Sequence, residues 1–158
     1  MQKVILDSIS LFFTLVVFGY ASLLDYKHRE VTNKLWVIGC VFSIPFLFNH
    51  LLIFNTILSI IVPCVFALVL WYFGAFGGAD SKALITLSLL IPMGFDDSIP
   101  YFSLVCFMFA CVLAMPYCLF SIFKKENLKK LEIPLLVYLF FGILVSLFVG
   151  KWFIELIL

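Results

Sequence analysis

The sequence predicts an all-α membrane protein, a bundle of about six transmembrane helices that forms a single domain. Apolar residues make up 65% of the 158 residues and charged residues 12%, against roughly 45–50% and 25% in soluble domains. The apolar residues are gathered in long runs with short polar stretches between them. At about 20 residues per crossing, this length holds about six spans and leaves no room for a separate soluble domain.

Six apolar runs give the expected helices, approximately 4–24, 35–54, 56–73, 83–95, 99–123 and 133–149. The first run is longer than the core of a signal peptide and lacks a small-residue cleavage pattern, so we expect it to be retained. The second and third runs are split only by Asn49, His50 and Asn55. A five-span arrangement, in which these two runs form one crossing, is the alternative.

The fourth apolar run is short. Between Lys82 and Asp96 there are thirteen residues, which make about 20 Å of helix against a hydrocarbon core of about 30 Å. The small residues 74–79 just before it allow a helix to end inside the protein. We therefore expect this helix to start near Asp80, below the membrane surface.

The basic residues predict the orientation, because cytoplasmic loops retain Lys and Arg. With six spans, one end of the bundle carries Lys27, Arg29, Lys34, Lys82, Lys124, Lys125, Lys129 and Lys130. We expect this end to face the cytoplasm from the plasma membrane, with both termini outside. The net charge of +1 gives no electrostatic case for nucleic acid, and the lipid bilayer is the expected partner surface.

No metal or cofactor is expected. The cysteines all lie in apolar runs without a Cys-x-x-Cys pair, as is typical of small buried side chains rather than a disulfide or zinc framework. They are Cys40, Cys64, Cys106, Cys111 and Cys118. His28 lies near a carboxylate but has no second cluster of ligands.

Two carboxylates, Asp25 and Asp80, stand at the cytoplasmic ends of expected helices. A carboxylate in the membrane zone costs roughly 2.5–3.5 kcal/mol, so each needs a reason to be there. If the two approach, they titrate as a coupled pair, one ionised and one protonated, and can hydrolyse a peptide without a metal. Alternatively, Asp25 is a solvated helix end paired with Lys27 or Arg29, and Asp80 is an N-cap.

Two sequence motifs resemble the paired signature of type IV prepilin peptidases and archaeal preflagellin peptidases, membrane aspartyl peptidases of the GxGD type. They are DYKHREVTN at residues 25–33 and GGADSK at residues 77–82, and the likeness continues to Pro134 and Gly142 in the last run. The resemblance implies that Asp25 and Asp80 are catalytic. It further implies that the supporting and substrate-positioning residues are Arg29, Asn33, Gly77, Gly78 and Lys82.

The resemblance implies an endopeptidase that cuts the basic leader from prepilin or archaellin-like precursors at the cytoplasmic membrane face. One departure is Ala79, which replaces the second glycine of the strict motif and would resist a positive φ. A second is that the chain lacks the Cys-x-x-Cys insertion of larger relatives that also methylate their product. We therefore expect peptidase activity without methyltransferase activity.

Two other functions remain open at this point. The chain would be a small proton- or cation-coupled transporter if Asp80 acts alone as an ion site near broken helix ends. It would be a non-catalytic assembly subunit if neither carboxylate is needed.

Overall fold

The part of the chain that the structure describes folds into six α-helices, the number that the sequence predicts. The computed structural model describes residues 2–28, 30–50, 54–91, 101–123 and 134–157. The helices are α1 (Gln2–His28), α2 (Asn33–His50), α3 (Phe54–Tyr72), α4 (Gly78–Leu90), α5 (Phe102–Phe123) and α6 (Leu135–Ile157). No strand occurs in the described ranges.

Three of the helices are long and apolar enough to cross a bilayer, with spans at Ile5–His28, Asn55–Tyr72 and Phe102–Phe120. Two shorter apolar helical segments, Asn33–Leu47 and Leu135–Val149, accompany them. The outer faces of these helices expose large apolar side chains; Phe12, Met108 and Phe148, for example, are each more than 60% exposed. Such a surface is stable in lipid and not in water, so the chain is an all-α membrane protein.

Several helices extend beyond the apolar runs that predict them. The first continues past residue 24 to His28, the last continues past 149 to Ile157, and α4 begins at Gly78 instead of residue 83. An apolar run marks the part of a helix that meets lipid, whereas backbone hydrogen bonding continues through polar residues beyond it. The expected residues 92–95 of the fourth helix lie outside the described ranges.

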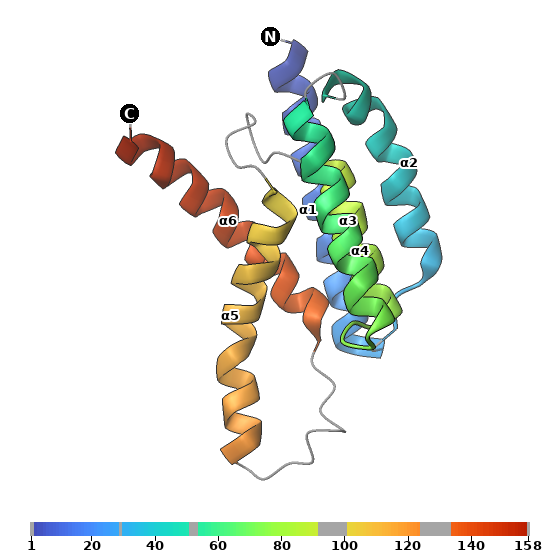
Figure 1. Cartoon of the computed structure of the whole chain (residues 1–158), viewed down its shortest axis with the longest axis vertical. Coiled ribbons are helices and arrows are strands. Elements are labelled where there is room, and N and C mark those ends of the chain that lie inside the picture. Colours follow the sequence, from blue (N-terminus) through green and yellow to red (C-terminus); the bar gives the residue numbers. More distant parts are fainter. Residues whose placement is uncertain (1, 29, 51–53, 92–100, 124–133, 158) are drawn as a thin grey trace.

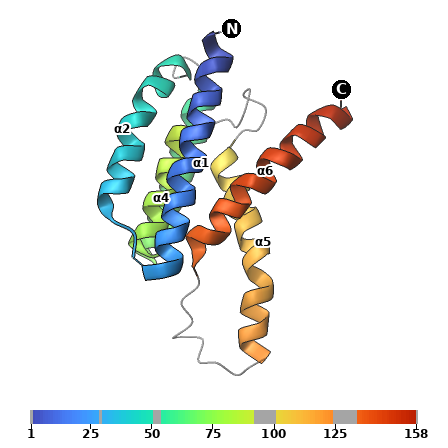
Figure 2. The same ribbon diagram turned by 180° about the vertical axis from the view of Figure 1, so that it is seen from behind.

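The short helix α4 lies at the centre of the molecule. Figures 1 and 2 show α1 to α4 side by side, with α5 leaning on them and α6 crossing behind α5 and tilting away. All five other helices contact α4. More than half of its residues are buried, among them Leu84, Leu87 and Leu90. A helix that faces protein on all sides has no need to match the bilayer thickness.

Both ends of α4 are held by hydrogen bonds. At its C-terminal end, the buried hydroxyl of Ser10 on α1 donates to the carbonyl of Leu90 over 2.6 Å. At its N-terminal end, the hydroxyl and the backbone N–H of Ser81 donate to the carbonyl of Gly77. The bond from Ser10 satisfies a carbonyl that the end of a helix leaves without an intrahelical partner, and the Ser81 N–H makes the first backbone bond of the helix itself.

Two glycines allow helices to approach closely. An added Cβ at Gly39 on α2 would lie 2.6 Å from Cγ2 of Thr86 on α4. An added Cβ at Gly142 on α6 would overlap the backbone carbonyl of Cys106 and approach the backbone nitrogen of Ala110, both on α5. Glycine at these two positions therefore sets the distance between helices, as small residues do in membrane bundles.

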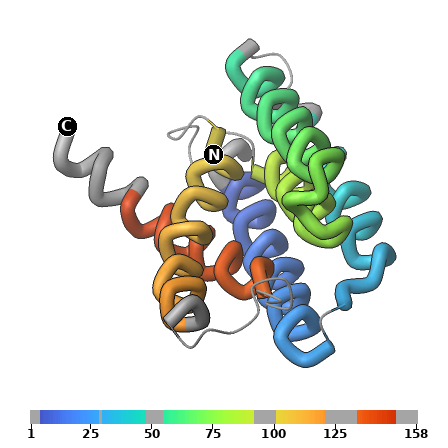
Figure 3. The backbone as a smooth tube through the Cα atoms, turned by 60° about the horizontal axis from the view of Figure 1, so that its bottom comes forward, coloured from blue at the N-terminus to red at the C-terminus, as the bar shows by residue number. Residues whose placement is uncertain are grey.

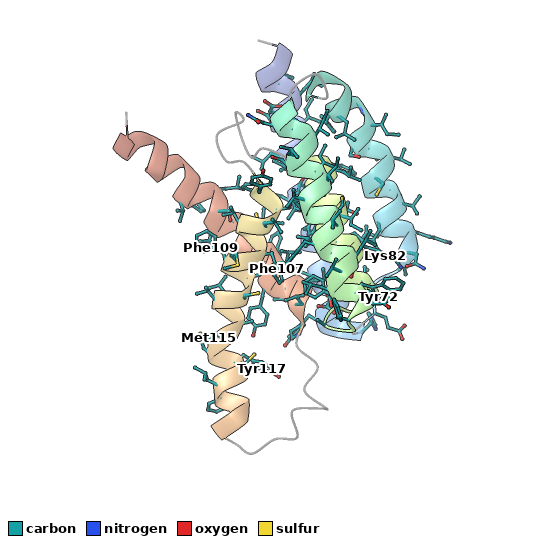
Figure 4. All side chains as sticks on the ribbon, viewed as in Figure 1. Tyr72, Lys82, Phe107, Phe109, Met115 and Tyr117 are labelled. Carbon is teal, nitrogen blue, oxygen red and sulfur yellow. The ribbon has the colours of Figure 1, made fainter. Side chains whose placement is uncertain are left out.

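Aromatic side chains attach α5 to the turn before α4. The ring of Phe107 on α5 packs edge-on against Phe66 of α3 and Phe76 in the α3–α4 turn, with centroids 5.9 Å and 5.2 Å apart. Figure 4 shows Phe107 at this junction, and Met115 and Tyr117 further along α5, beyond the bundle. The turn that leads into α4 is thus braced from a second helix.

Candidate active site

Asp25 and Asp80 lie at the same end of the bundle. Asp25 is in the last turn of α1, and Asp80 is in the first turn of α4. The end of α1, the start of α4 and the start of α6 come together at the lower end of Figure 1, which is the end turned forward in Figure 3. The helices α1 and α4 are in contact, and the charge of Asp25 acts on the carboxyl of Asp80.

The carboxylate of Asp80 is held by the motif that precedes it. Gly77 is the N-cap of α4 and Asp80 is its third residue. The backbone N–H of Gly77 donates to Oδ2 of Asp80 over 3.2 Å. This is the arrangement in which an acidic residue in the first turn satisfies the N-cap N–H. The alternative in which Asp80 is itself the N-cap is therefore wrong, because the helix starts three residues earlier, with Gly77 as its N-cap.

The side chain of Asp80 is partly buried. It lies ahead of the expected membrane-crossing segment, which starts at residue 83. The pKa of Asp80 is raised from 3.8 to about 6: burial is the largest cause, the hydrogen bond from Gly77 lowers the pKa, and the nearby charge of Asp25 raises it. Asp80 therefore carries a proton in a mildly acidic range in which an exposed aspartate would be ionised.

Asp25 is linked to a different helix. Its Oδ2 accepts a hydrogen bond from the backbone N–H of Leu136, 3.2 Å away, in the first turn of α6. The two residues are 111 positions apart in the chain. The N-terminal turn of a helix presents unpaired N–H groups and a positive dipole end, which favour a negative charge. The first turn of α6 thus stabilises a negative charge on Asp25, whereas burial favours the neutral form of Asp80.

The glycines before Asp80 differ in what they contact. An added Cβ at Gly77 would lie 3.1 Å from Oδ2 of Asp80, and an added Cβ at Gly78 would meet nothing within 4 Å. Neither Gly77 nor Gly78 has a positive φ; in this stretch only Gly74 does, at 71°. Ala79 is helical. The absence of a glycine at 79 therefore brings no backbone strain, and Gly77 matters for the room that it leaves beside the carboxylate.

Asn33 and Lys82 bond to each other instead of to the carboxylates. Nζ of Lys82 donates to Oδ1 of Asn33 over 2.7 Å, which links the start of α4 to the start of α2. Both side chains are exposed, and Figure 4 shows Lys82 on the side of α4 that faces α2. The pair fixes the register between two helix starts at the edge of the site.

Some expected residues lie outside the described ranges. They are Arg29 and the four lysines of residues 124–130. Within the described ranges, no three His, Cys, Asp or Glu side chains gather as they would around a metal ion.

One contact of the site was not expected from the sequence. The N–H of Leu136 belongs to the backbone, so no residue type marks it, and only Pro134 indicates where that helix begins. Proline is common just at a helix start, because it has no N–H and its φ suits the first turn.

The fold and the site define a class of protein: a multi-pass membrane protein with two carboxylates from separate helices at one end. The type IV leader peptidase family matches this sequence over residues 12–119, which include both carboxylates. This match covers well over half of the chain, so the chain belongs to the type IV leader peptidase family and is a peptidase. No curated protein matches this sequence. The helix α6 lies outside the matched residues.

Proposed function

We propose that this peptidase is an aspartyl endopeptidase in which Asp25 and Asp80 form the catalytic pair. The observation that carries the proposal is the position of the two carboxylates at one end of the bundle, close enough for the charge of one to raise the pKa of the other. Carboxylates whose surroundings favour different protonation states are the pattern of an acid and a base in one site.

The two side chains can divide the chemistry as follows. The ionised Asp25 takes a proton from a water molecule, and the water oxygen adds to the scissile carbonyl carbon. The protonated Asp80 gives its proton to the carbonyl oxygen, which forms a neutral gem-diol. When the C–N bond breaks, the leaving nitrogen takes the proton from Asp25 and Asp80 recovers its own. The products are an acid and an amine, and the pair returns to its starting state.

The proposed substrates are prepilin or archaellin-like precursors, which are cut between a basic leader and a hydrophobic helix. The apolar outer faces of this bundle suit a substrate whose helix stays in the bilayer. The carboxylates at a helix end suit a scissile bond at the membrane surface. From the distribution of basic residues we place this end at the cytoplasmic face, with both termini outside.

We further propose that the chain trims its substrate without methylating it. The basis is the sequence, which has no Cys-x-x-Cys spacing of the kind found in the methylating relatives. The test is incubation with a precursor and labelled S-adenosylmethionine. Cleavage without transfer of the label agrees with the proposal, and a labelled product contradicts it.

The peptidase proposal is tested by co-expression with an epitope-tagged precursor. Asp25→Asn and Asp80→Asn should each leave the precursor uncut, as resolved by gel mobility and by sequencing of the product N-terminus. The control is Glu30→Gln, which removes an exposed carboxylate at the same end and should leave cleavage intact. A transporter that uses Asp80 alone would tolerate Asp25→Asn, and an assembly subunit would tolerate both changes.

A further inference from the structure

The start of α6 contributes a group to the site, although this helix lies outside the part of the chain that matches the family. The backbone N–H of Leu136 donates to Oδ2 of Asp25 over 3.2 Å. Figures 1 and 3 show the start of α6 beside the end of α1, whereas the rest of α6 tilts away. The first turn of α6 thus contacts α1 where Asp25 stands, and the two helices also pack at Gly19, against Phe140.

The Leu136 donor is held in place by its surroundings. The first four N–H groups of a helix have no intrahelical acceptor. In this first turn, the N–H of Val137 donates to the carbonyl of Pro134, and the N–H of Leu136 is directed to Asp25. The side chain of Leu136 is 1% exposed, and Gly142 packs against the backbone of α5 two turns further on. Packing on both sides therefore fixes the direction of the N–H.

The hydrogen bond from Leu136 affects the charge of the Asp25 carboxyl group. An amide N–H at the positive end of a helix bonds more strongly to a carboxylate anion than to a neutral acid. Among the described residues, the carboxylate of Asp80 accepts a hydrogen bond from the Gly77 N–H of its own turn, and burial favours its neutral form. The two carboxyl groups are thus in unequal surroundings before any substrate binds.

We propose that the first turn of α6, through the N–H of Leu136, is a positioning element that keeps Asp25 ionised as the base and so leaves the proton on Asp80. The proposal rests on the aspartyl peptidase function above and goes beyond it, because it assigns the two roles and gives α6 a part in them. Other ionisable groups of the described residues stand at this end of the bundle. They are Tyr26, Lys27, His28 and Glu30 within or after the end of α1, Lys34 on α2, Tyr72 at the end of α3, Lys82 with Asp80 on α4, and Tyr138 on α6.

The test compares two substitutions at one position. Leu136→Pro removes the N–H, at a place in the first turn of a helix where proline is tolerated. Leu136→Ala keeps the N–H and removes the buried side chain. Leu135→Pro places the proline at the first helical residue and keeps the N–H of 136. For each purified variant, kcat/KM for cleavage of a synthetic leader-containing precursor is measured between about pH 4 and pH 8.

Loss of the N–H should move the acidic limb of the profile to higher pH by about one unit, which corresponds to the loss of one charge-assisted hydrogen bond. At a pH below this limb, kcat/KM of Leu136→Pro should therefore fall about tenfold more than at neutral pH. Leu136→Ala and Leu135→Pro should keep the wild-type position of the limb, because any loss of packing lowers the rate equally at every pH. A Leu136→Pro profile parallel to that of Leu136→Ala would overturn the proposal.

A second variant covers the case in which Leu136→Pro does not fold. Replacing Leu136 by its α-hydroxy acid during translation turns one amide into an ester, which removes the N–H and leaves the side chain in place. The ester should shift the acidic limb in the same direction, and an unshifted limb would again overturn the proposal. If Asp25→Asn retains cleavage, the peptidase proposal itself fails; if Asp25→Asn is inactive and the limb does not move, only the role of α6 fails.

Discussion

The space beside Gly77 gives the sharpest test of how the site is built. In Gly77→Ala, the new Cβ would lie 3.1 Å from Oδ2 of Asp80, which is tighter than nine in ten real Cβ contacts. The carboxylate must retreat by a few tenths of an ångström, away from the N–H that holds it at 3.2 Å. The backbone itself takes no strain, because φ of Gly77 is −67°.

The expected loss can be estimated from two effects. A neutral hydrogen bond contributes about 0.5–1.5 kcal/mol, and a misplacement of about 1 Å near the reacting atoms can cost roughly a hundredfold in rate. A shift of a few tenths of an ångström with a weakened bond should therefore lower kcat/KM by about 3- to 30-fold. The assay is leader cleavage by the purified protein in detergent, with its folded fraction checked by size-exclusion chromatography.

Gly78→Ala is the matched control for Gly77→Ala. Its Cβ would meet nothing within 4 Å, and it lies at the first residue of α4. Alanine forms helix better than glycine by up to about 1 kcal/mol, so this variant should be slightly more stable and cleave within about twofold of wild type. Equal losses for the two variants would refute the reasoning, because they would show that the motif needs glycine for a reason other than room beside Asp80.

Three further predictions concern stability and pH. Because the folded protein raises the pKa of Asp80 to about 6, the proton on Asp80 stabilises the fold fully below about pH 4, and this stabilisation is lost as the pH rises through 6. The thermal unfolding temperature of wild type should therefore fall over this pH range. The same dependence of the unfolding temperature on pH in Asp80→Asn would contradict the prediction. Asn33→Ala and Lys82→Met should each lower the free energy of unfolding by less than about 1 kcal/mol, since the hydrogen bond between the two side chains is exposed. The double variant should lose no more than either single variant, and additive losses would show that the two side chains act separately. Gly39→Ala should destabilise by about 1–3 kcal/mol through overlap with Cγ2 of Thr86, and Thr86→Ser, which removes that methyl group, should restore most of the loss in denaturation midpoint; no rescue would place the strain elsewhere.

Much of the fold follows from features that a sequence displays directly. Six apolar runs, one of them short, predict the six helices of the described ranges, and two short motifs around Asp25 and Asp80 indicate the family. Helix ends are harder, because an apolar run ends where lipid ends and not where hydrogen bonding does. The sequence therefore places Gly77 and Gly78 before the helix that carries Asp80, whereas Gly77 is its N-cap and Gly78 its first residue.

The contacts of the site were less accessible from the sequence. Lys82 and Asn33 were expected near the carboxylates, but the pairing of their exposed side chains depends on how α2 and α4 pack, which neither helix specifies alone. The N–H of Leu136 belongs to a backbone group 111 residues from Asp25, and backbone groups carry no signature of residue type. A tertiary contact of this kind becomes visible only once the helices are placed together.

The central claim, that Asp25 and Asp80 act as one catalytic unit, is tested most directly by a double-mutant cycle. The measurement is kcat for leader cleavage by purified wild type, Asp25→Asn, Asp80→Asn and the double variant. Residues that act together are strongly non-additive, so each single change should remove nearly all activity and the double variant should be no slower than either. Substantial cleavage by one single variant, or losses that multiply in the double variant, would contradict the account.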